Sequence, residues 1–333
     1  MLRVHFTSDD LARVRVAPGP DFLWEISNSV QTLQRRDGER EFGDWRRWVR
    51  PRLSSSPRLL SRLLPPRGYS PDFLTPTSGD RGTLQASVDV LLSTPRGRLR
   101  AELARLATPV QLPGWLGALA GGDAEALRQL GGALRTYQRE ALAPYWRRVH
   151  ADIDADRALR LRGLLDGGTE GLLAGLGPQF RWRAPVLEAA YPVEQDLWLR
   201  GRGLVLQPSF FCWPTPITLA DGDLPPVLVY PIHHSADWAG PAPAPGTRPA
   251  AGSGPLGPLL GHTRAGILRA TRTGCSTVEA ARLLDVTHPA VSQHINVLRA
   301  AGLVTTVRRA GRSFHVATAE GRALLAAEEY GPE

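Results

Sequence analysis

Two short helices and a turn are predicted by residues 276–304, which read STVEAARLLDVTHPAVSQHINVLRAAGLV. Ser276 begins a capping box, because its hydroxyl can accept the third amide of the helix while the Glu279 side chain reaches back. The first helix is expected to run to about Leu284. The apolar residues on one face of this helix are Val278, Ala281 and Leu284.

A short turn is expected at residues 285–287, and Thr287 suits the N-cap of a second helix. Pro289 falls in the first turn of that helix, where its missing N–H leaves no hydrogen bond unmade. The second helix is predicted to run from His288 to about Ala301. It should end at Gly302, since glycine readily adopts the left-handed conformation that closes many helices.

The second helix has two unlike faces. Its inward face is apolar at helical spacing and consists of Val291, Ile295 and Leu298. Its outward face carries mostly neutral hydrogen-bonding groups and consists of His288, Ser292, Asn296 and Arg299, with Gln293 beside them. Hydroxyl, amide and imidazole groups match the edges of bases in the major groove of DNA. Two short helices, a tight turn and this face together predict a helix-turn-helix.

The residues after the second helix predict a β-hairpin. Leu303–Val307 and Ser313–Val316 are strand-like and flank a basic tip at residues 308–312. Helices are expected before the motif, at about Leu259–Arg272, and after it, at about Ala319–Glu329. This order predicts a winged helix-turn-helix, with a three-helix core, a hairpin wing and a flanking C-terminal helix. The wing arginines would contact phosphates or enter the minor groove.

The run HPAVSQHINVLRAAGLV at residues 288–304 closely resembles the recognition helix and exit of the ArsR group of bacterial winged-helix repressors. The resemblance is carried by the Val-Ser-x-His step at 291–294 and by Leu-Arg-x-Ala-Gly-Leu-Val at 298–304. It implies a homodimer joined through the first and last helices of the module. It also implies binding to an inverted repeat in double-stranded DNA, with repression relieved by a signal. The predicted DNA-binding residues are Thr287, His288, Ser292, Gln293, His294, Asn296, Arg299, Arg308, Arg309 and Arg312.

Metal-sensing members of that family place Cys-x-Cys at the start of the first motif helix, where this chain has residues 276–278, Ser-Thr-Val. Cys275 stands alone beside this position, and one thiol supplies too few ligands for a soft-metal site. We predict no metal and interpret Cys275 as a loop cysteine, with a ligand or redox role as the alternative. An alternative interpretation also remains for the predicted DNA-binding residues. His288 and His294 would then be caps or packing residues, and the wing arginines a solvated turn.

Arginine dominates the charge of the chain. The 333 residues include 40 Lys plus Arg, all of them Arg, and 32 Asp plus Glu, for a formal net charge of +8. We interpret the missing lysine as a coding bias, with selection of the phosphate-binding guanidinium as the alternative. Between residues 262 and 322, nine arginines accompany three acids, so positive charge is concentrated on the predicted motif.

The composition excludes several classes of protein. A membrane span would need about 18 uncharged apolar residues in a row, and the sequence has no such run. The first ten residues have no apolar core of the kind that marks a signal peptide. Cys212 and Cys275 are too few for a disulfide framework, so a reducing, cytoplasmic location is expected.

Residues 239–258 are almost entirely Pro, Gly, Ala and small polar residues, and they predict a linker. The linker divides the chain into an N-terminal domain at residues 1–238 and the winged helix-turn-helix domain at residues 259–333. The N-terminal domain is expected to be α+β, mainly helical, with a sensing, dimerising or partner-binding role. The fold class of the whole chain is therefore α+β and mainly helical.

Amphipathic spacing predicts several elements of the N-terminal domain. We expect a hairpin from residues 2–6 and 14–16, helices at 20–37, 84–107, 123–149 and 151–165, and strands at 203–206, 210–212 and 227–230. Residues 201–209, 213–214 and 228–231 resemble an actinobacterial set of ArsR-like regulators with a long N-terminal domain. That resemblance implies no particular ligand or chemistry.

No catalytic or cofactor-binding motif is found in the sequence, so we expect neither an enzyme nor a cofactor. His150, Asp152, Asp154 and Asp156 resemble metal ligands, but we interpret them as a solvated helical face. His233-His234 is interpreted as part of a loop, because two ligands are too few for a metal.

Two further features of the N-terminal domain allow two interpretations each. The stretch at residues 35–67 holds ten arginines and four acids. We interpret it as a solvated surface, with contact to phosphate as the alternative. Phe210, Phe211 and Trp213 surround Cys212 and are interpreted as core, with a small-molecule pocket as the alternative.

These features predict a dimeric, sequence-specific DNA-binding transcriptional regulator, and a repressor in particular. Its expected partners are double-stranded DNA, a second copy of the chain and a small-molecule effector, but no membrane. Two other classes stay open. One is an enzyme or partner-binding protein whose N-terminal domain carries the activity, with the winged helix as an accessory module. The other is a winged helix that binds protein instead of DNA.

Overall fold

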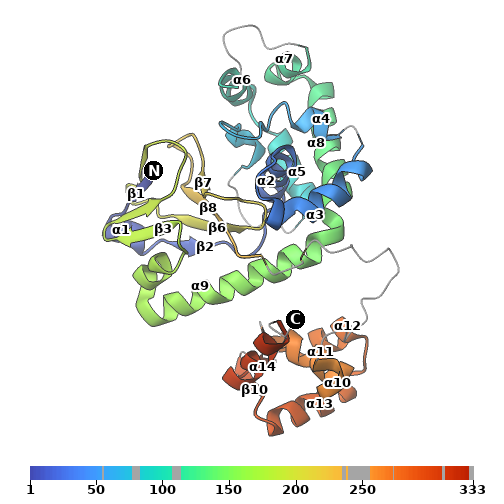
Figure 1. Ribbon diagram of the computed structural model, residues 1–333. Helices are drawn as coiled ribbons and strands as arrows, with labels where there is room; N and C mark the ends of the chain where they lie inside the picture. Colours follow the sequence, from blue (N-terminus) through green and yellow to red (C-terminus); the bar gives the residue numbers. More distant parts are fainter. Residues whose placement is uncertain are drawn as a thin grey trace. The chain divides into compact units, whose positions relative to one another are not determined.

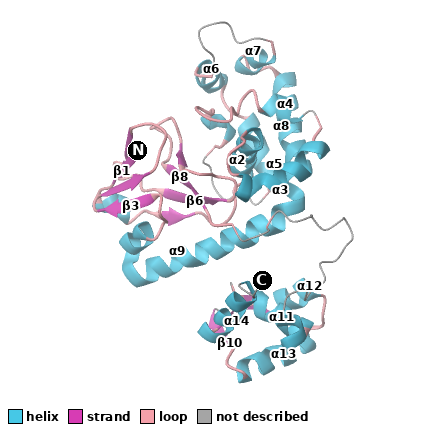
Figure 2. Cartoon of the chain, viewed as in Figure 1, coloured by secondary structure: helices cyan, strands magenta, loops and turns pink. Residues whose placement is uncertain are grey.

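The computed structural model describes residues 1–54, 56–76, 83–106, 114–234, 238, 256–272, 274–309 and 312–329. The chain forms two compact units, an N-terminal unit at Met1–Ala242 and a C-terminal unit at Pro243–Glu333 (Figures 1 and 2). Residues 239–255 of the predicted linker lie outside the described ranges, and Leu256–Leu260 form a helix, α10. No helix in the described ranges is long and apolar enough to cross a membrane.

The described part of the N-terminal unit contains two four-stranded sheets. The first has the order β3 (Phe180–Arg183), β4 (Val186–Ala189), β1 (Leu2–His5) and β5 (Gln195–Trp198). The second has the order β2 (Arg15–Val16), β6 (Val205–Ser209), β8 (Val227–Pro231) and β7 (Ile217–Thr218). β4 lies between β3 and β1 and is antiparallel to both, whereas β5 is parallel to β1. In the second sheet, β6 is parallel to β2 and β8, and β7 is antiparallel to β8.

The predicted N-terminal hairpin is wrong, because β1 and β2 belong to different sheets. A short helix, α1 (Ser8–Leu11), separates them and begins with a capping box between Thr7 and Asp10. The buried Asp10 carboxylate also accepts the Gly203 amide at 2.9 Å. Buried carboxylates need such donors, and this one fixes the turn that leads the chain from one sheet to the other.

Helices α2 to α8 form a second region of the N-terminal unit, and the long helix α9 runs from them to the sheets (Figure 1). The bounds are α2 Phe22–Gln34, α3 Glu39–Val49, α4 Ser56–Leu60, α5 Leu84–Leu92, α6 Arg96–Ala104, α7 Trp115–Ala120, α8 Ala124–Tyr137 and α9 Trp146–Ala174. Short 3-10 or π turns occur at Arg50–Arg52, Asp72–Leu74, Gln138–Leu142 and Ala143–Tyr145.

Prolines and glycines interrupt helices that the apolar spacing predicts as continuous. The segment 84–107 contains two helices, α5 and α6, with Pro95 at the start of the second. In the segment 123–149, a turn containing Pro144 separates α8 from α9, because proline lacks the N–H that a helix interior needs. The predicted helix at 151–165 is the middle of α9, whose backbone leaves helical geometry at Gly167 and Gly168.

The aromatic residues after β6 form core, which confirms that interpretation over a pocket. Phe210 and Phe211 are buried in the main hydrophobic cluster. The ring of Phe211 lies 4.8 Å from Trp45 and 5.7 Å from Phe42, measured between centroids. Cys212 is also buried, and burial raises the pKa of its thiol. The thiol is therefore held in its protonated, unreactive form.

The predicted solvated face of α9 is wrong at Asp156, which is only 6% exposed. Its carboxylate accepts the Tyr230 hydroxyl at 2.6 Å and pairs with Arg160 at 2.5 Å, which ties α9 to β8. His234 does lie in a loop, but its ring packs inward and bonds the Phe210 carbonyl at 2.6 Å. Among the described residues, no three His, Cys, Asp or Glu side chains are grouped as metal ligands.

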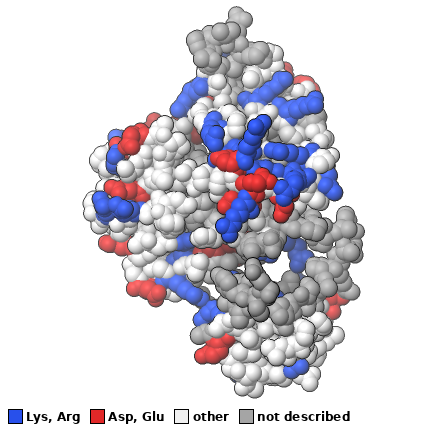
Figure 3. Space-filling view, viewed as in Figure 1, with Lys and Arg blue, Asp and Glu red and all other residues white. Residues whose placement is uncertain are grey.

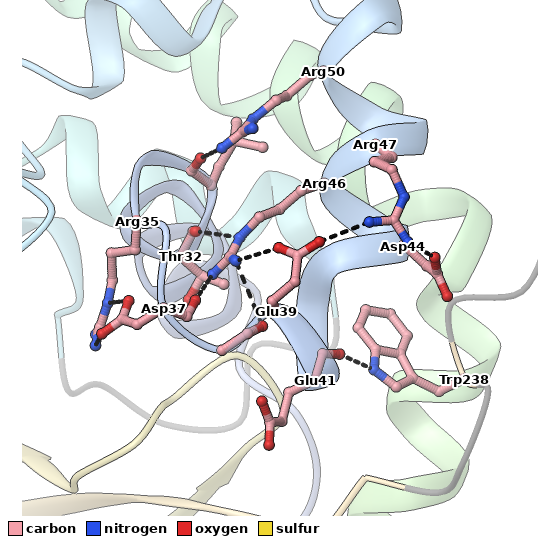
Figure 4. A network of polar contacts seen from close by, with 12 residues as sticks. Thr32, Arg35, Asp37, Glu39, Glu41, Asp44, Arg46, Arg47, Arg50 and Trp238 are labelled. Carbon is pink, nitrogen blue, oxygen red and sulfur yellow. Dashed lines mark hydrogen bonds and ion pairs between the residues drawn. The ribbon is translucent and has the colours of Figure 1, made fainter.

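The basic stretch at residues 35–67 is in part a structural network (Figure 4). Arginine and acidic side chains also gather on the face of the helical region that Figure 3 shows. Arg46 is only 2% exposed and donates to the carbonyls of Thr32 at 3.0 Å and Asp37 at 2.5 Å. Asp37 in turn accepts both Arg35 and Arg67. The solvated-surface interpretation is therefore wrong for Arg46, since this guanidinium closes the turn between α2 and α3 from inside.

The C-terminal unit has the predicted winged helix-turn-helix order. Its elements are α10 Leu256–Leu260, α11 His262–Ala270, β9 Cys275–Ser276, α12 Thr277–Leu284, α13 His288–Ala300, β10 Val304–Arg309, β11 Arg312–Ala317 and α14 Ala319–Glu329. The three strands form a sheet in the order β10, β11, β9. The single helix predicted at 259–272 is divided at Gly261, whose φ of +84° favours glycine.

Candidate nucleic-acid interface

The first helix of the motif, α12, is fixed at both ends by its own sequence. The predicted capping box is confirmed, because the Ser276 hydroxyl accepts the Glu279 amide and the Glu279 carboxylate accepts the Ser276 amide. At the other end, Asp285 has a left-handed backbone with φ of +52°, and the Val286 amide bonds the Ala281 carbonyl at 3.1 Å. These bonds satisfy backbone groups that a helix end leaves free, and they set the angle of the turn.

The second helix, α13, begins and ends as predicted. Thr287 is its N-cap and Pro289 lies in its first turn, but the Thr287 side chain makes no capping hydrogen bond. The exposed hydroxyl of Thr287 therefore stays available to an outside partner. At the C-terminus, Gly302 has φ of +73° and the Leu303 amide bonds the Leu298 carbonyl at 2.9 Å. This is the closing pattern that the glycine predicts.

The predicted inward face of α13 is confirmed. Val291, Ile295 and Leu298 are buried in the hydrophobic cluster of the C-terminal unit. The prediction for α12 is wrong at Val278, which is 42% exposed, while Ala280 and Ala281 are buried. Small side chains at these two positions let α12 approach α11 and α13 closely, and this fixes the direction in which α13 projects its outer face.

The outward face of α13 is exposed and has no partner within the described residues. Its exposed polar members are His288, Ser292, Gln293, Asn296 and Arg299. None of their side chains forms a hydrogen bond or ion pair with another described residue. Solvent must satisfy these groups in the free protein, so an incoming ligand with matching donors and acceptors can replace that water.

The two histidines of α13 differ in position. His288 is exposed in the first helical turn, next to the N-cap residue Thr287, and it is not itself the cap. His294 is half-buried at the edge of the face. His288 is therefore exposed to solvent like the amides of the outer face. His294 is only partly exposed, because the rest of its side chain is covered by the protein.

Val297 joins the outer face and is missing from the predicted set of residues. It is 43% exposed and lies four residues after Gln293, on the same side of α13. An exposed apolar side chain among amides can contact the methyl group of thymine. The helical spacing from Gln293 would have found it, but an apolar residue is normally assigned to the core.

The wing consists of β10 and β11, paired antiparallel from Val304 opposite Ala317 to Arg309 opposite Arg312. The side chains of Arg308, Arg309 and Arg312 lie outside the described part of the structure, as do residues 310–311. The backbone of the hairpin nevertheless places all three arginines at its tip. They stand together on the element that follows α13, as the sequence predicts for a wing.

His315 anchors the wing to the helices, and the sequence gives little sign of it. Its ring nitrogens lie 3.0 Å from the Thr306 hydroxyl in β10 and 3.0 Å from the Thr277 hydroxyl at the start of α12. Burial, with a smaller effect of Arg299, lowers the pKa of His315. A neutral ring therefore bridges hairpin and helix, and it fixes where the wing stands beside α13.

Cys275 is not a loop cysteine, because it forms the short strand β9 opposite His315 of β11. It is buried, and burial raises the pKa of its thiol to about 11. Metal ligation and redox chemistry both require the thiolate, which this position disfavours. Its role is to complete the sheet and the hydrophobic cluster of the C-terminal unit.

Comparison with protein families finds a match to a family described as a helix-turn-helix domain, over residues 262–307. The match begins with α11 and ends in β10, so it includes α12, the turn and all of α13. No curated protein and no solved structure matches the chain. The C-terminal unit thus contains a helix-turn-helix domain, a class of domain that implies DNA as the partner.

Proposed function

We propose that the protein is a dimeric, sequence-specific transcriptional regulator of the ArsR type that acts as a repressor. In this proposal α13 enters the major groove of an inverted-repeat operator, and the wing contacts phosphates or the minor groove. The N-terminal unit would sense a signal or support the dimer. A signal would have to bind the DNA-bound and free states unequally in order to change the affinity for DNA.

The observation that carries the proposal is the composition of the exposed face of α13. An ordinary solvent face is rich in paired charges, as on α3, where Arg47 pairs with Glu39. The face of α13 instead presents the amides of Gln293 and Asn296 and the hydroxyl of Ser292, none of which has a partner among the described residues. Amides form two-point contacts with adenine, and hydroxyl groups bond several bases. The arginines of the wing supply the complementary, sequence-independent attraction to phosphate.

The proposed dimer rests on the geometry of DNA and on the resemblance to ArsR repressors. A single recognition helix reads only a few base pairs, and two copies would have to place α13 in successive major grooves, roughly 34 Å apart. The resemblance to ArsR repressors favours contact between copies through the first and last helices of the module. The proposal gives neither unit a catalytic role. In its support, burial raises the pKa of both cysteine thiols, which leaves neither activated as a nucleophile.

The test is binding of the full-length protein to DNA from upstream of its own gene, with a scrambled fragment as control, at two salt concentrations. We expect preference for the upstream fragment and weaker binding at higher salt. A variant with Ser292, Gln293 and Asn296 all changed to Ala should lose the preference but keep the salt-dependent binding to scrambled DNA. It should unfold at the wild-type midpoint, since the three side chains have no partners among the described residues. Unchanged preference in this variant would refute the proposed role of α13.

A further inference from the structure

An open pocket with a volume of about 540 Å³ lies between α4, α7 and α8 in the N-terminal unit. Its size is in the range of pockets that bind small organic molecules. Leu59, Trp115 and Ala133 give it apolar walls, and Gly132 leaves the α8 side without a side chain. An added Cβ at Gly132 would meet no atom within 4 Å, so the space in front of this helix is open.

Two arginines line the pocket and lack an acidic partner. Arg58 and Arg62 stand four residues apart, on α4 and the turn that follows it, and both are exposed. Neither forms an ion pair with any described residue. The Glu140 carboxylate accepts hydrogen bonds from the amide and the hydroxyl of Ser54, at 2.9 and 3.0 Å, and Ser54 lines the pocket. Glu140 forms no ion pair with Arg58 or Arg62.

Some arginines of the helical region, nearer to α3, do have acidic partners. Arg35 and Arg67 share the carboxylate of Asp37, and Arg47 pairs with Glu39. Two cations four residues apart repel each other, and an anion between them would remove that repulsion. Neither Arg58 nor Arg62 thus has its charge balanced by an ion pair within the described part of the protein.

The wall formed by Trp115 is apolar toward the pocket. Its indole Nε1 is buried and has no acceptor in the described part of the chain, so the half-buried side chain exposes carbon atoms and not the N–H. The hydroxyl of Thr136, which also lines the pocket, has no partner among the described residues either.

We propose that this pocket binds a small organic anion, a carboxylate or a phosphate monoester carried on a flat apolar body. Arg58 and Arg62 hold the anionic group, because guanidinium forms two-point hydrogen bonds with carboxylate and phosphate oxygens. The ring of Trp115 forms part of the apolar wall beside the flat body. The flat body lies against Gly132 and Ala133, where the absence of large side chains leaves room for a ring.

The pocket would be where a signal reaches the regulator, and that part of the inference rests on the proposed function. Binding itself does not rest on it, since all the lining residues belong to the N-terminal unit. A titration without DNA therefore tests the pocket alone. Failure of the pocket and failure of DNA binding would be seen in separate measurements.

The experiment uses full-length protein and the fluorescent aromatic anion 8-anilinonaphthalene-1-sulfonate as the probe. We expect saturable binding of one probe per chain. Displacement by benzoate would indicate a carboxylate site, displacement by phenyl phosphate a phosphate site, and the neutral benzyl alcohol should displace nothing. Gly132→Leu, which fills the open space, and the double variant Arg58→Gln/Arg62→Gln should each weaken probe binding at least tenfold.

Matched controls come from α6, which does not line the pocket. Gly97→Leu adds the same side chain at an exposed glycine with no atom within 4 Å, and Arg100→Gln removes one exposed charge. Both should bind the probe like wild type. Probe binding that does not saturate, or that the pocket variants leave unchanged, would overturn the proposal.

Discussion

Replacing the glutamate at position 25 by glutamine is expected to remove one pH dependence from the stability of the N-terminal unit. Glu25 lies on α2 and is fully buried, where its carboxylate accepts the amides of Phe210 at 2.9 Å and Phe211 at 3.0 Å. It thereby ties the helical region to the end of β6. Burial raises the pKa of Glu25 from 4.5 to about 7, and the two amides only partly offset that effect.

The sign and size follow from the difference between the folded and unfolded pKa values. The folded protein binds the proton more tightly, so this contribution to stability is fully present below pH 4.5 and is lost as the pH rises through 7. Between pH 5 and pH 8 the loss amounts to roughly 2–3 kcal/mol, at about 1.4 kcal/mol for each unit of pKa. The side-chain amide of the Glu25→Gln variant cannot ionise, so the variant lacks this loss.

The assay is urea unfolding of wild type and Glu25→Gln at several pH values, followed by tryptophan fluorescence. All nine tryptophans precede residue 239, so the signal reports the N-terminal unit alone. The stability of wild type minus that of the variant should fall by roughly 2–3 kcal/mol from pH 5 to pH 8. Subtraction cancels other groups, including His234, whose pKa burial lowers. A constant difference would show that the two amides alone hold the carboxylate ionised.

Three further substitutions test interactions within each of the two units. Ile295→Ala empties a buried site in α13 and should cost roughly 2–5 kcal/mol, seen as faster hydrogen exchange across residues 262–307. Ser276→Ala removes the capping box and should cost about 1 kcal/mol, with lost exchange protection confined to α12. Tyr230→Phe leaves the buried Asp156 without its 2.6 Å donor and should cost about 1–3 kcal/mol in the fluorescence assay; an unchanged urea midpoint would contradict this.

The C-terminal unit could be predicted from sequence because its determinants are local. Ser276 and Glu279 cap a helix within one turn, and Gly302 closes the next helix through bonds to residues at most five positions away. Apolar spacing placed Ile295 inside for the same reason. The spacing failed at Val278, because two adjacent alanines, and not the larger residue, face the neighbouring helices.

The N-terminal unit was harder to predict because distant contacts determine it. β1 pairs with β4 and β5, which come more than 180 residues later, and no local sequence pattern predicts that pairing. Arg46 and Asp156 belong to residue types that are normally solvated, yet each is buried because its partners come from other elements. The pocket beside Trp115 likewise exists only once α4, α7 and α8 are packed.

The same side-chain chemistry has opposite roles in the two units, and the difference lies in what the fold places opposite each group. Asn28 is 3% exposed and donates to the Ser209 hydroxyl at 3.0 Å, so its amide is used internally to join α2 to β6. Asn296 is an identical amide on an exposed helix face, with no described partner. The exposed amides of α13 are therefore available to an outside partner, whereas the amide of Asn28 is not. Base edges offer the matching donors and acceptors, so in the proposed function the preference for one DNA sequence over another would come from α13.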